Sequence, residues 1–480
     1  MKVMLINPPR VDGCTVVREE RFEHRDIGSC YPPLSLLQTA GEIEAAGYEL
    51  LFLDANGFNL TNEAVFKKMK EYHPDVVITR IAFDCQPYDY AVIEYAKQEC
   101  GAITITRCKV IAEAQFVLQQ YMQTYPAVDI FLMTEPDAII VSLLADLKNN
   151  ASAGDLHTAG IAVRDAAGTL RITKQPEYPE HLDETALPAW HLLPTLQPYH
   201  TGVLESPFAT VQTSRGCPYG CQFCAYRKNK YRTYSPQRVV NELKRLITVH
   251  GLKTFLFFDD VMGLKKGRLE NICRLMIEEK LNLKWSCCTR ADLLTAEQLK
   301  LMKRAGCEEI AFGIESGAEQ VLERTRKGVS KDDIRRAAEL CRREGVLFYG
   351  MCIIGLPGET WDTVHQTITF IKEINPFYTQ FCFSTPLPNT PNYHWYKENG
   401  YLLTEDWTKY SSLYPEPVVR TEAMSKEDLI EARTVVYRKL VLRFWYLVSK
   451  IRIFDWRWNI QGLKKIMERI IAILKKETVR

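Results

Sequence analysis

Three cysteines, Cys217, Cys221 and Cys224, lie within eight residues at a C-x3-C-x2-C spacing, directly after an apolar run. Thiolates on a short, turn-rich loop of this kind can converge on an iron–sulfur cluster. The next cysteine is Cys273, far along the chain on a predicted helix. A four-iron cluster on this loop would therefore keep one iron open, as catalytic metal sites keep a free position. A structural zinc site is the alternative, but zinc prefers four protein ligands and the loop offers three.

The segment 214–224 that holds these cysteines resembles the signature of the radical S-adenosylmethionine (radical SAM) enzymes. The resemblance implies that the open iron binds the amino and carboxylate groups of S-adenosylmethionine (SAM). An electron from the cluster then cleaves SAM to a 5′-deoxyadenosyl radical, which removes a hydrogen atom from the substrate. It also implies an external electron donor of the flavodoxin or ferredoxin type. Phe223 matches the family's habit of placing a ring against the adenine.

The composition is that of an ordinary globular protein. The 480 residues are 46% hydrophobic and 25% charged with a net charge of +2, so no strong field argues for a nucleic-acid partner. The 15 cysteines are an odd number and are scattered, unlike the framework of a small secreted protein. The N-terminus reads as a first strand, and no run approaches the ~20 apolar residues of a membrane span. We therefore expect a cytoplasmic protein, whose reducing surroundings suit an oxygen-sensitive cluster.

Residues 1–150 alternate short apolar runs with longer amphipathic stretches. The apolar runs are Val3–Asn7, Leu50–Asp54, Val76–Ile81, Ile103–Thr106 and Ile130–Met133. Such alternation predicts an α/β domain with a doubly wound, Rossmann-like parallel sheet and helices on both faces. A sheet of this type binds ligands beyond the carboxyl ends of its strands, at the switch point of the strand order.

This first domain resembles a diverged cobalamin-binding domain, the usual N-terminal partner in one large subclass of radical SAM enzymes. The resemblance rests on four short segments, 7–9, 31–36, 46–49 and 128–129. It implies a corrinoid site at the carboxyl ends of the strands.

Two strand-end loops depart from that family's pattern. The family has Gly-Gly after the fourth strand and Gly-Glu-Gly-Glu after the fifth, whereas this sequence has the segments 105–109 and 134–137 without glycine. Glycine serves where a ligand lies close to the backbone, so Arg107, Lys109 and Pro136 add bulk there. We therefore expect that the domain has kept its fold and has lost or reshaped its cobalamin site.

Residues 151–205 contain a predicted hairpin and a Pro-rich linker, and residues 206–395 again alternate strand-like and helical stretches. Six runs read as strands: Ala209–Thr213, Thr254–Phe258, Lys284–Cys288, Glu309–Ile314, Phe348–Ile354 and Thr379–Ser384. The repetition predicts parallel strands in a partial (β/α)6 TIM barrel, with the chemistry at their carboxyl ends.

Polar residues and glycines follow four of these strands at the expected end: Asp259 and Asp260, Arg290, Glu315, and Gly355 with Leu356. By resemblance, an acidic residue at 259 or 260 accepts hydrogen bonds from the methionyl ammonium. Arg290 could hold the methionyl carboxylate in a bidentate pair, and Glu315 could bond the ribose hydroxyls. The loop at Gly355 allows a flat approach of the adenine. Each feature alone is typical of a solvated loop, but together they match the predicted strand ends.

Residues 396–480 are predicted to be helical, and they become basic and aromatic toward the end. Cations such as Lys439 and Arg443 alternate with rings such as Trp445 and Phe454. The pattern is typical of a helix that caps the barrel mouth, and also of an amphipathic segment on a membrane surface. We favour the cap over a peripheral membrane contact.

The sequence thus predicts a radical SAM enzyme that holds one [4Fe-4S] cluster and SAM and acts on a small molecule. If the first domain holds no cobalamin, as we favour, the substrate radical must resolve by elimination, dehydration, rearrangement or carbon–carbon bond formation. If the domain holds cobalamin, the resemblance implies methyl transfer to an unactivated carbon. A non-catalytic iron–sulfur scaffold is a third alternative, and it leaves the charged strand ends without a purpose.

Overall fold

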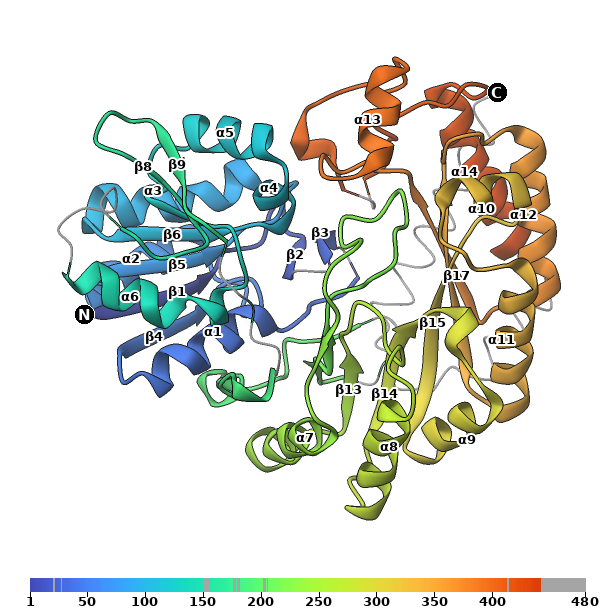
Figure 1. Ribbon diagram of the computed structural model, residues 1–480, viewed down its shortest axis with the longest axis horizontal. Coiled ribbons are helices and arrows are strands. Elements are labelled where there is room, and N and C mark those ends of the chain that lie inside the picture. Colours follow the sequence, from blue (N-terminus) through green and yellow to red (C-terminus); the bar gives the residue numbers. More distant parts are fainter. Residues whose placement is uncertain are drawn as a thin grey trace.

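The computed structural model describes residues 1–441 apart from 20–21, 27, 150–155, 176–177, 179–181, 202–203, 205 and 412–413. Figure 1 shows two α/β units side by side, with the N-terminal sheet at the left and a second sheet at the right. The basic, aromatic end of the chain, for which we considered a membrane contact, lies at 442–480 and so outside the described residues.

The N-terminal sheet contains five parallel strands in the order β4-β1-β5-β6-β7. They are β1 (Lys2–Asn7), β4 (Glu49–Asp54), β5 (Val76–Arg80), β6 (Ile103–Arg107) and β7 (Ile130–Leu132). The order reverses at β1, which is the doubly wound arrangement. The five predicted runs and the fold class are therefore confirmed.

Helices cover both faces of this sheet, which explains why its strands are nearly continuous apolar runs. Alternate side chains of β1 show the two faces. Val3 and Leu5 pack with α1 (Leu34–Ala45) and α6 (Ile140–Asn149), whereas Met4 and Ile6 pack with α2 (Asn62–Tyr72) and α3 (Gln86–Cys100). Because helices cover both faces, a ligand would bind at the edge formed by the carboxyl ends of the strands.

The predicted hairpin exists, but it is part of the N-terminal sheet. Strands β8 (Ile161–Arg164) and β9 (Leu170–Ile172) pair with each other antiparallel, and β8 pairs antiparallel with β7. The sheet therefore has seven strands, the last two of which come from the segment that the sequence placed between the domains.

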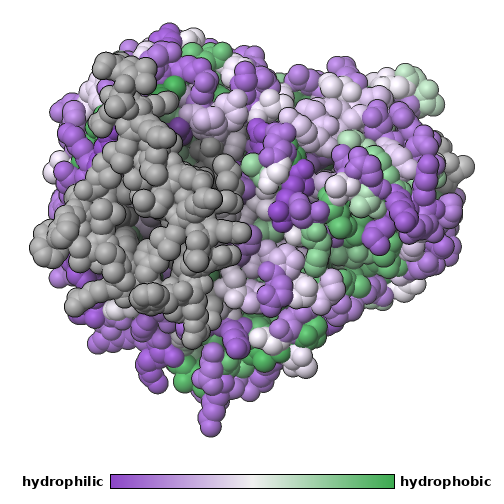
Figure 2. All heavy atoms as spheres, turned by 180° about the vertical axis from the view of Figure 1, so that it is seen from behind, coloured by the Kyte–Doolittle hydropathy of each residue, from purple (hydrophilic) through white to green (hydrophobic). Residues whose placement is uncertain are grey.

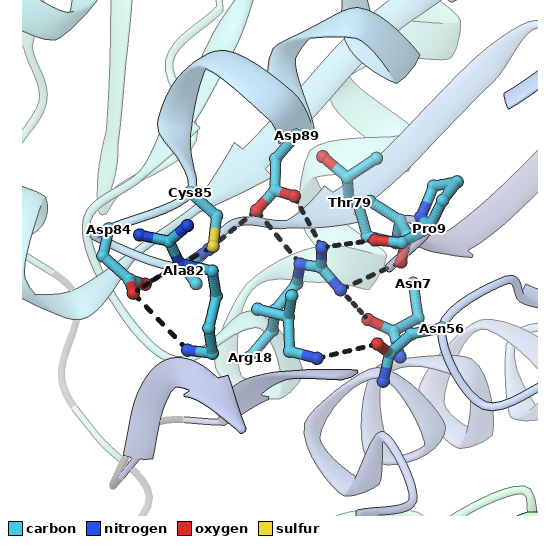
Figure 3. Close-up of polar contacts among 12 residues, drawn as sticks. Asn7, Pro9, Arg18, Asn56, Thr79, Ala82, Asp84, Cys85 and Asp89 are labelled. Atoms are coloured by element: carbon cyan, nitrogen blue, oxygen red, sulfur yellow. Dashed lines mark hydrogen bonds and ion pairs between the residues drawn. The ribbon is translucent and has the colours of Figure 1, made fainter. Parts of the chain in front are cut away.

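A second hairpin, which the sequence did not predict, covers the carboxyl ends of β1, β5 and β6. It consists of β2 (Thr15–Glu19) and β3 (Phe22–Asp26). Figure 3 shows Arg18 of β2 pointing toward Asp89 at the start of α3 and toward the loop after β1. Arg18 donates to both oxygens of Asp89 at 3.0 and 2.6 Å and to the Pro8 carbonyl at 2.9 Å.

The β3 strand is fixed to the next two strand ends through Glu23. Its carboxylate pairs with Arg80, at the end of β5, at 3.5 Å. It also accepts from the Cys108 thiol at 3.0 Å and from the Lys109 backbone N–H at 3.3 Å, just after β6. The hairpin therefore forms a polar cover over part of the edge where a ligand would bind.

The second sheet has six parallel strands in the order β10-β13-β14-β15-β16-β17. They are β10 (Phe208–Val211), β13 (Thr254–Phe257), β14 (Lys284–Thr289), β15 (Cys307–Glu315), β16 (Leu347–Ile354) and β17 (Tyr378–Phe383). This arrangement confirms the six predicted strands. Because all of them run in parallel, their carboxyl ends lie at one edge.

The connecting helices of the second sheet are α7 (Pro236–His250), α8 (Arg268–Glu278), α9 (Ala296–Arg304), α10 (Glu319–Thr325), α11 (Lys331–Glu344) and α12 (Trp361–Ile374). Helix α11 shows how the sequence defines them. The side chains of Ser330 and Asp333 form a capping box, and the helix ends at Gly345 in the left-handed conformation. Such a cap contributes roughly 1 kcal/mol.

The C-terminal part of the described chain forms α13 (Pro391–Glu398) and α14 (Lys426–Val441). Leu429, Ala432 and Val436 of α14 join the core of the second sheet, so this helix packs against the barrel. Within the described residues no helix has the length and hydropathy to cross a bilayer. In Figure 2, which views the molecule from behind, hydrophobic residues form separate areas among hydrophilic ones.

Candidate active site

The three-cysteine loop leaves and re-enters the second unit through a short antiparallel ladder. Ser214–Arg215 (β11) pairs with Arg232–Thr233 (β12), and Arg215 stands directly opposite Arg232. Gly216 follows with φ +85°, where a Cβ would overlap the carbonyl oxygen of Lys230. A glycine is therefore required at the point where the loop begins.

The three cysteine thiols lie close enough to influence one another. Burial, together with the neighbouring thiols of Cys221 and Cys217, raises the pKa of Cys224 to about 12. The Cys217 carbonyl accepts from the Asn229 backbone N–H at 2.9 Å, which folds the loop back on itself. In the described part of the chain no three His, Cys, Asp or Glu side chains meet as ligands of one ion. The fit of these thiols to a cluster therefore rests on their chemistry, spacing and proximity.

The two predicted aspartates after β13 differ in their surroundings. Asp259 is 1% exposed and accepts from the Thr213 backbone N–H at 2.6 Å, the Thr213 hydroxyl at 2.5 Å and the Ser214 hydroxyl at 2.7 Å. Asp260 accepts from the Gly216 backbone N–H at 2.9 Å and lines a pocket. Asp259 thus fixes the end of β10 to the end of β13, whereas Asp260 faces open space.

Arg290, after β14, is buried and already paired. It donates to both oxygens of Asp292 at 3.0 Å and to the Lys327 carbonyl at 2.8 Å. Its guanidinium also lies 3.6 Å from the ring centroid of Tyr219, which belongs to the cysteine loop. Arg290 therefore joins the third strand end to the cysteine loop.

Glu315, the last residue of β15, has φ +62°, which is uncommon for a residue with a side chain. Its carboxylate accepts from the Lys327 ammonium at 2.6 Å, and the same ammonium donates to the Gly313 carbonyl at 2.5 Å. A Cβ at Gly313 would overlap both charged groups. Lys327 was not predicted from the sequence, because it follows a short helix and has no strand-end pattern.

Phe223 and Leu356 belong to one small apolar cluster. They pack with Ala318 and Val321 of the segment after β15 and with Ile353. The structure therefore brings the two predicted adenine contacts to the same wall, although they are far apart in the sequence. Gly355, which precedes Leu356, has φ +89° and donates its N–H to the Glu359 carboxylate.

The predicted residues gather around the cysteine loop. Burial raises the pKa of Cys221. The nearby charge of Glu315 also raises it, and those of Lys327 and Arg290 lower it. The charge of Asp260 contributes to the raised pKa of Cys224. Thiols, carboxylates, cations and an apolar wall therefore meet at the carboxyl edge of the second sheet, a set that fits a zwitterionic nucleoside such as SAM.

A pocket of about 120 Å³ lies between the two sheets beside this site. Its walls come from the carboxyl ends of both sheets: Arg107, Met133 and Glu135 on one side, and Gln212, Gly216 and Asp260 on the other. The predicted bulky residues Arg107, Lys109 and Pro136 all line it.

Ion pairs cross from one unit to the other at the rim of this pocket. Arg215 Nη1 lies 2.8 Å from Glu135 Oε2 and 2.5 Å from Asp137 Oδ2, and Arg232 also pairs with Glu135. Burial alone would raise the pKa of Glu135, but the two guanidinium groups outweigh it and hold the pKa below its ordinary value. The sequence marked Glu135 and Asp137 as remnants of a motif and did not reveal these partners.

Comparison with known proteins identifies the domain in which these residues lie. The Radical SAM superfamily model matches residues 211–371, which span β13–β16, the cysteine loop and the charged strand ends. This domain brings a [4Fe-4S] cluster and SAM as cofactors.

Relatives share the layout of the whole chain. An uncharacterized methyltransferase of Pyrococcus horikoshii is 28% identical over 95% of this chain and 94% of its own length. An anaerobic magnesium-protoporphyrin IX monomethyl ester cyclase of Cereibacter sphaeroides is 23% identical over 92% of this chain and 71% of its own length. The radical SAM methyltransferase TsrM of Kitasatospora setae, solved with cobalamin and a [4Fe-4S] cluster, has a TM-score of 0.69 at 16% identity, over 92% of this chain and 89% of its own. The chain thus carries a Radical SAM domain and is an enzyme, and its fold is that of cobalamin-binding radical SAM proteins.

Proposed function

We propose that this enzyme transfers a methyl group to a carbon atom of a small molecule that lies between its two sheets. The observation that carries the proposal is the shared pocket, whose walls come from the carboxyl ends of both sheets and include Gly216 and Asp260 of the cysteine-loop region. The methyltransferase names of two similar proteins support methyl transfer better than the cobalamin-independent reactions that we favoured from the sequence.

We assign Cys217, Cys221 and Cys224 to the cluster. Asp260 then accepts from the methionyl ammonium, because its carboxylate faces the pocket, and Asp259 positions the two strand ends beneath it. Phe223 and Leu356 pack against the adenine. When bound, the cluster and SAM supply the radical that removes hydrogen, cobalamin supplies the methyl group, and a flavodoxin or ferredoxin supplies electrons.

Glu315 and Arg290 complete the cofactor site through their neighbours. We assign the Glu315 carboxylate to the ribose hydroxyls, held in place by Lys327. Arg290 is already bidentate to Asp292, so it meets the methionyl carboxylate with its remaining donors or after Asp292 moves. The residues of this chain thereby orient the cofactor and keep water from the reacting carbon.

The pocket fits a corrinoid in the chemistry of its lining. Besides Asp137 Oδ2, which has an ion pair with Arg215, the lining residues Ser35 and Arg232 have buried polar atoms without a hydrogen-bond partner in the described structure, namely Ser35 Oγ and Arg232 Nε and Nη1. Buried polar atoms generally have partners, and a ligand rich in amide groups could provide them.

The size of the pocket favours a second candidate function. Its volume of about 120 Å³ is below the roughly 300–1,000 Å³ of small-molecule sites. A corrinoid therefore requires the pocket to widen. A chain whose pocket stays this narrow would carry out a cobalamin-independent radical reaction.

The test is to reconstitute the cluster anaerobically, mix the protein with hydroxocobalamin or methylcobalamin, desalt it and record the visible spectrum. We expect near-stoichiometric retention of the corrinoid. No retention, with SAM still cleaved to 5′-deoxyadenosine, would reject methyl transfer and leave the cobalamin-independent reaction.

A further inference from the structure

We propose that Glu135 is a positioning residue for the cluster: it holds the two arginines that close the cysteine loop, and so lets the N-terminal sheet position the cluster ligands. The inference rests on the proposed role of Cys217, Cys221 and Cys224 as cluster ligands. It does not depend on the identity of the substrate or on cobalamin.

The ends of the cysteine loop meet at an electrostatically unfavourable place. Arg215 and Arg232 are directly opposite each other on the two-residue ladder, and both are buried, at 7% and 6% exposed. Like charges opposite each other destabilise a strand pair, and burial strengthens the repulsion because the surroundings screen it less. A ladder of two residues has few hydrogen bonds with which to oppose this repulsion.

Glu135 removes the repulsion by bonding both guanidinium groups at once. Its Oε2 accepts from Arg215 at 2.8 Å, and its Oε1 accepts from Arg232. Asp137 adds a second anion 2.5 Å from Arg215. Both acids belong to the loop after β7 of the N-terminal sheet, so the charge that stabilises the ladder comes from the other unit.

Arg215 has several hydrogen-bond partners, and its position determines where the cysteine loop begins. Besides Glu135 it donates to Gln212 Oε1 at 2.9 Å and to the Tyr234 hydroxyl at 2.8 Å. Its neighbour Gly216 donates to Asp260, and Cys217 follows. A displacement of Arg215 would therefore move both Cys217, the first cluster ligand, and Asp260, whose carboxylate is proposed to bind SAM.

The test compares Glu135→Gln with Glu135→Asp and with Glu113→Gln, all reconstituted anaerobically without cobalamin or substrate. Glu113 is the matched control: it ends the short helix Lys109–Glu113 of the same unit and accepts from Asn389 across the interface at 2.8 Å, whereas the carboxylates described on Arg215 and Arg232 are those of Glu135 and Asp137. The readouts are the iron content, the thermal midpoint of unfolding, and the electron paramagnetic resonance spectrum of the reduced cluster with and without SAM.

We expect Glu135→Gln to shift the spectrum of the reduced cluster and to weaken SAM binding about tenfold, which corresponds to about 1.4 kcal/mol. Glu135→Asp should restore most of both, and Glu113→Gln should match the wild type. The double variant Glu135→Gln with Arg232→Gln removes the repulsion, so it should recover the wild-type spectrum even if the single variant folds poorly.

A Glu135→Gln chain with wild-type iron content, spectrum and SAM affinity would overturn the inference. So would a double variant no better than the single one, because the effect would then not arise from the paired arginines. A wild-type chain that assembles no cluster would overturn both this inference and the proposed function, whereas a failure to bind cobalamin would affect the proposed function alone.

Discussion

The ammonium of Lys327 lies 2.6 Å from the Glu315 carboxylate, and the two side chains are 10% and 8% exposed, respectively. The pair stands at the end of β15 beside the Cys221 thiol. In the proposed site the Glu315 carboxylate binds the ribose hydroxyls of SAM while Lys327 holds it in place, so replacing Lys327 tests that assignment.

Replacing Lys327 with Met should leave the Glu315 carboxylate buried and unpaired. We expect a loss of about 3 kcal/mol in the free energy of unfolding and a clear loss of SAM affinity, measured by urea unfolding and by equilibrium dialysis. The surface pair Lys303–Glu308 provides a control, because Lys303→Met should change stability by less than about 1 kcal/mol. Unchanged SAM affinity in Lys327→Met would show that Glu315 does not bind the cofactor.

The cysteine loop should hold one cluster per chain. After anaerobic reconstitution, iron and sulfide analysis should give roughly four of each, and Cys221→Ala should lose most of both. Cys352→Ala, at a buried strand cysteine, should retain them. A two-cluster stoichiometry, or a cluster that survives Cys221→Ala, would contradict the assignment.

The stability of the second sheet should fall as the pH rises toward neutrality, because burial raises the pKa of Glu359 from 4.5 to about 7. Between these two values the folded chain binds a proton that the unfolded chain has released, so stability is fully present below the lower value and is lost through the higher one. The total is up to about 3 kcal/mol.

Glu359→Gln should therefore reduce the slope of the urea midpoint against pH between about pH 5 and pH 8, while Glu242, whose pKa burial also raises to about 7, maintains the remainder. The exposed Glu398→Gln on α13 serves as the control and should keep the wild-type slope. An equally steep dependence in Glu359→Gln would show that another group is responsible.

The hairpin β2–β3 should depend on its buried ion pair. Asp89→Asn leaves the Arg18 guanidinium without its anion and should cost about 3–5 kcal/mol in the free energy of unfolding. Glu71→Gln breaks an exposed pair with Lys67 and should cost under about 1 kcal/mol. Equal effects of the two changes would contradict the role given to Arg18.

The sequence predicted the strands well because each is a buried apolar run between turn residues, as in Val3–Asn7 and Phe348–Ile354. It missed the hairpin β2–β3 because Arg18 and Glu19 are charged and yet buried. Their burial depends on partners such as Asp89, 71 residues away in sequence, and no local pattern reveals such a distance.

The candidate site was predictable where a residue's role follows from its place at a strand end. Asp260, Glu315 and Leu356 were predicted in this way, and their roles stay predictions. Their charged neighbours were not predicted: Lys327 follows a short helix, and Glu135 lies in a loop of the other unit. The assignment of residues 206–395 to one domain also stays a prediction.

The hairpin β2–β3 has a consequence for the order of folding. Its residues Arg18 and Glu23 find their partners only after Asp89, Arg80 and Cys108 have joined the sheet. Contacts of such long sequence separation form late, because the chain between them must first become ordered. We therefore expect the apolar strands to assemble first and the carboxyl edge to become ordered last. The surface that would contact a ligand would then form only after the sheet beneath it is complete.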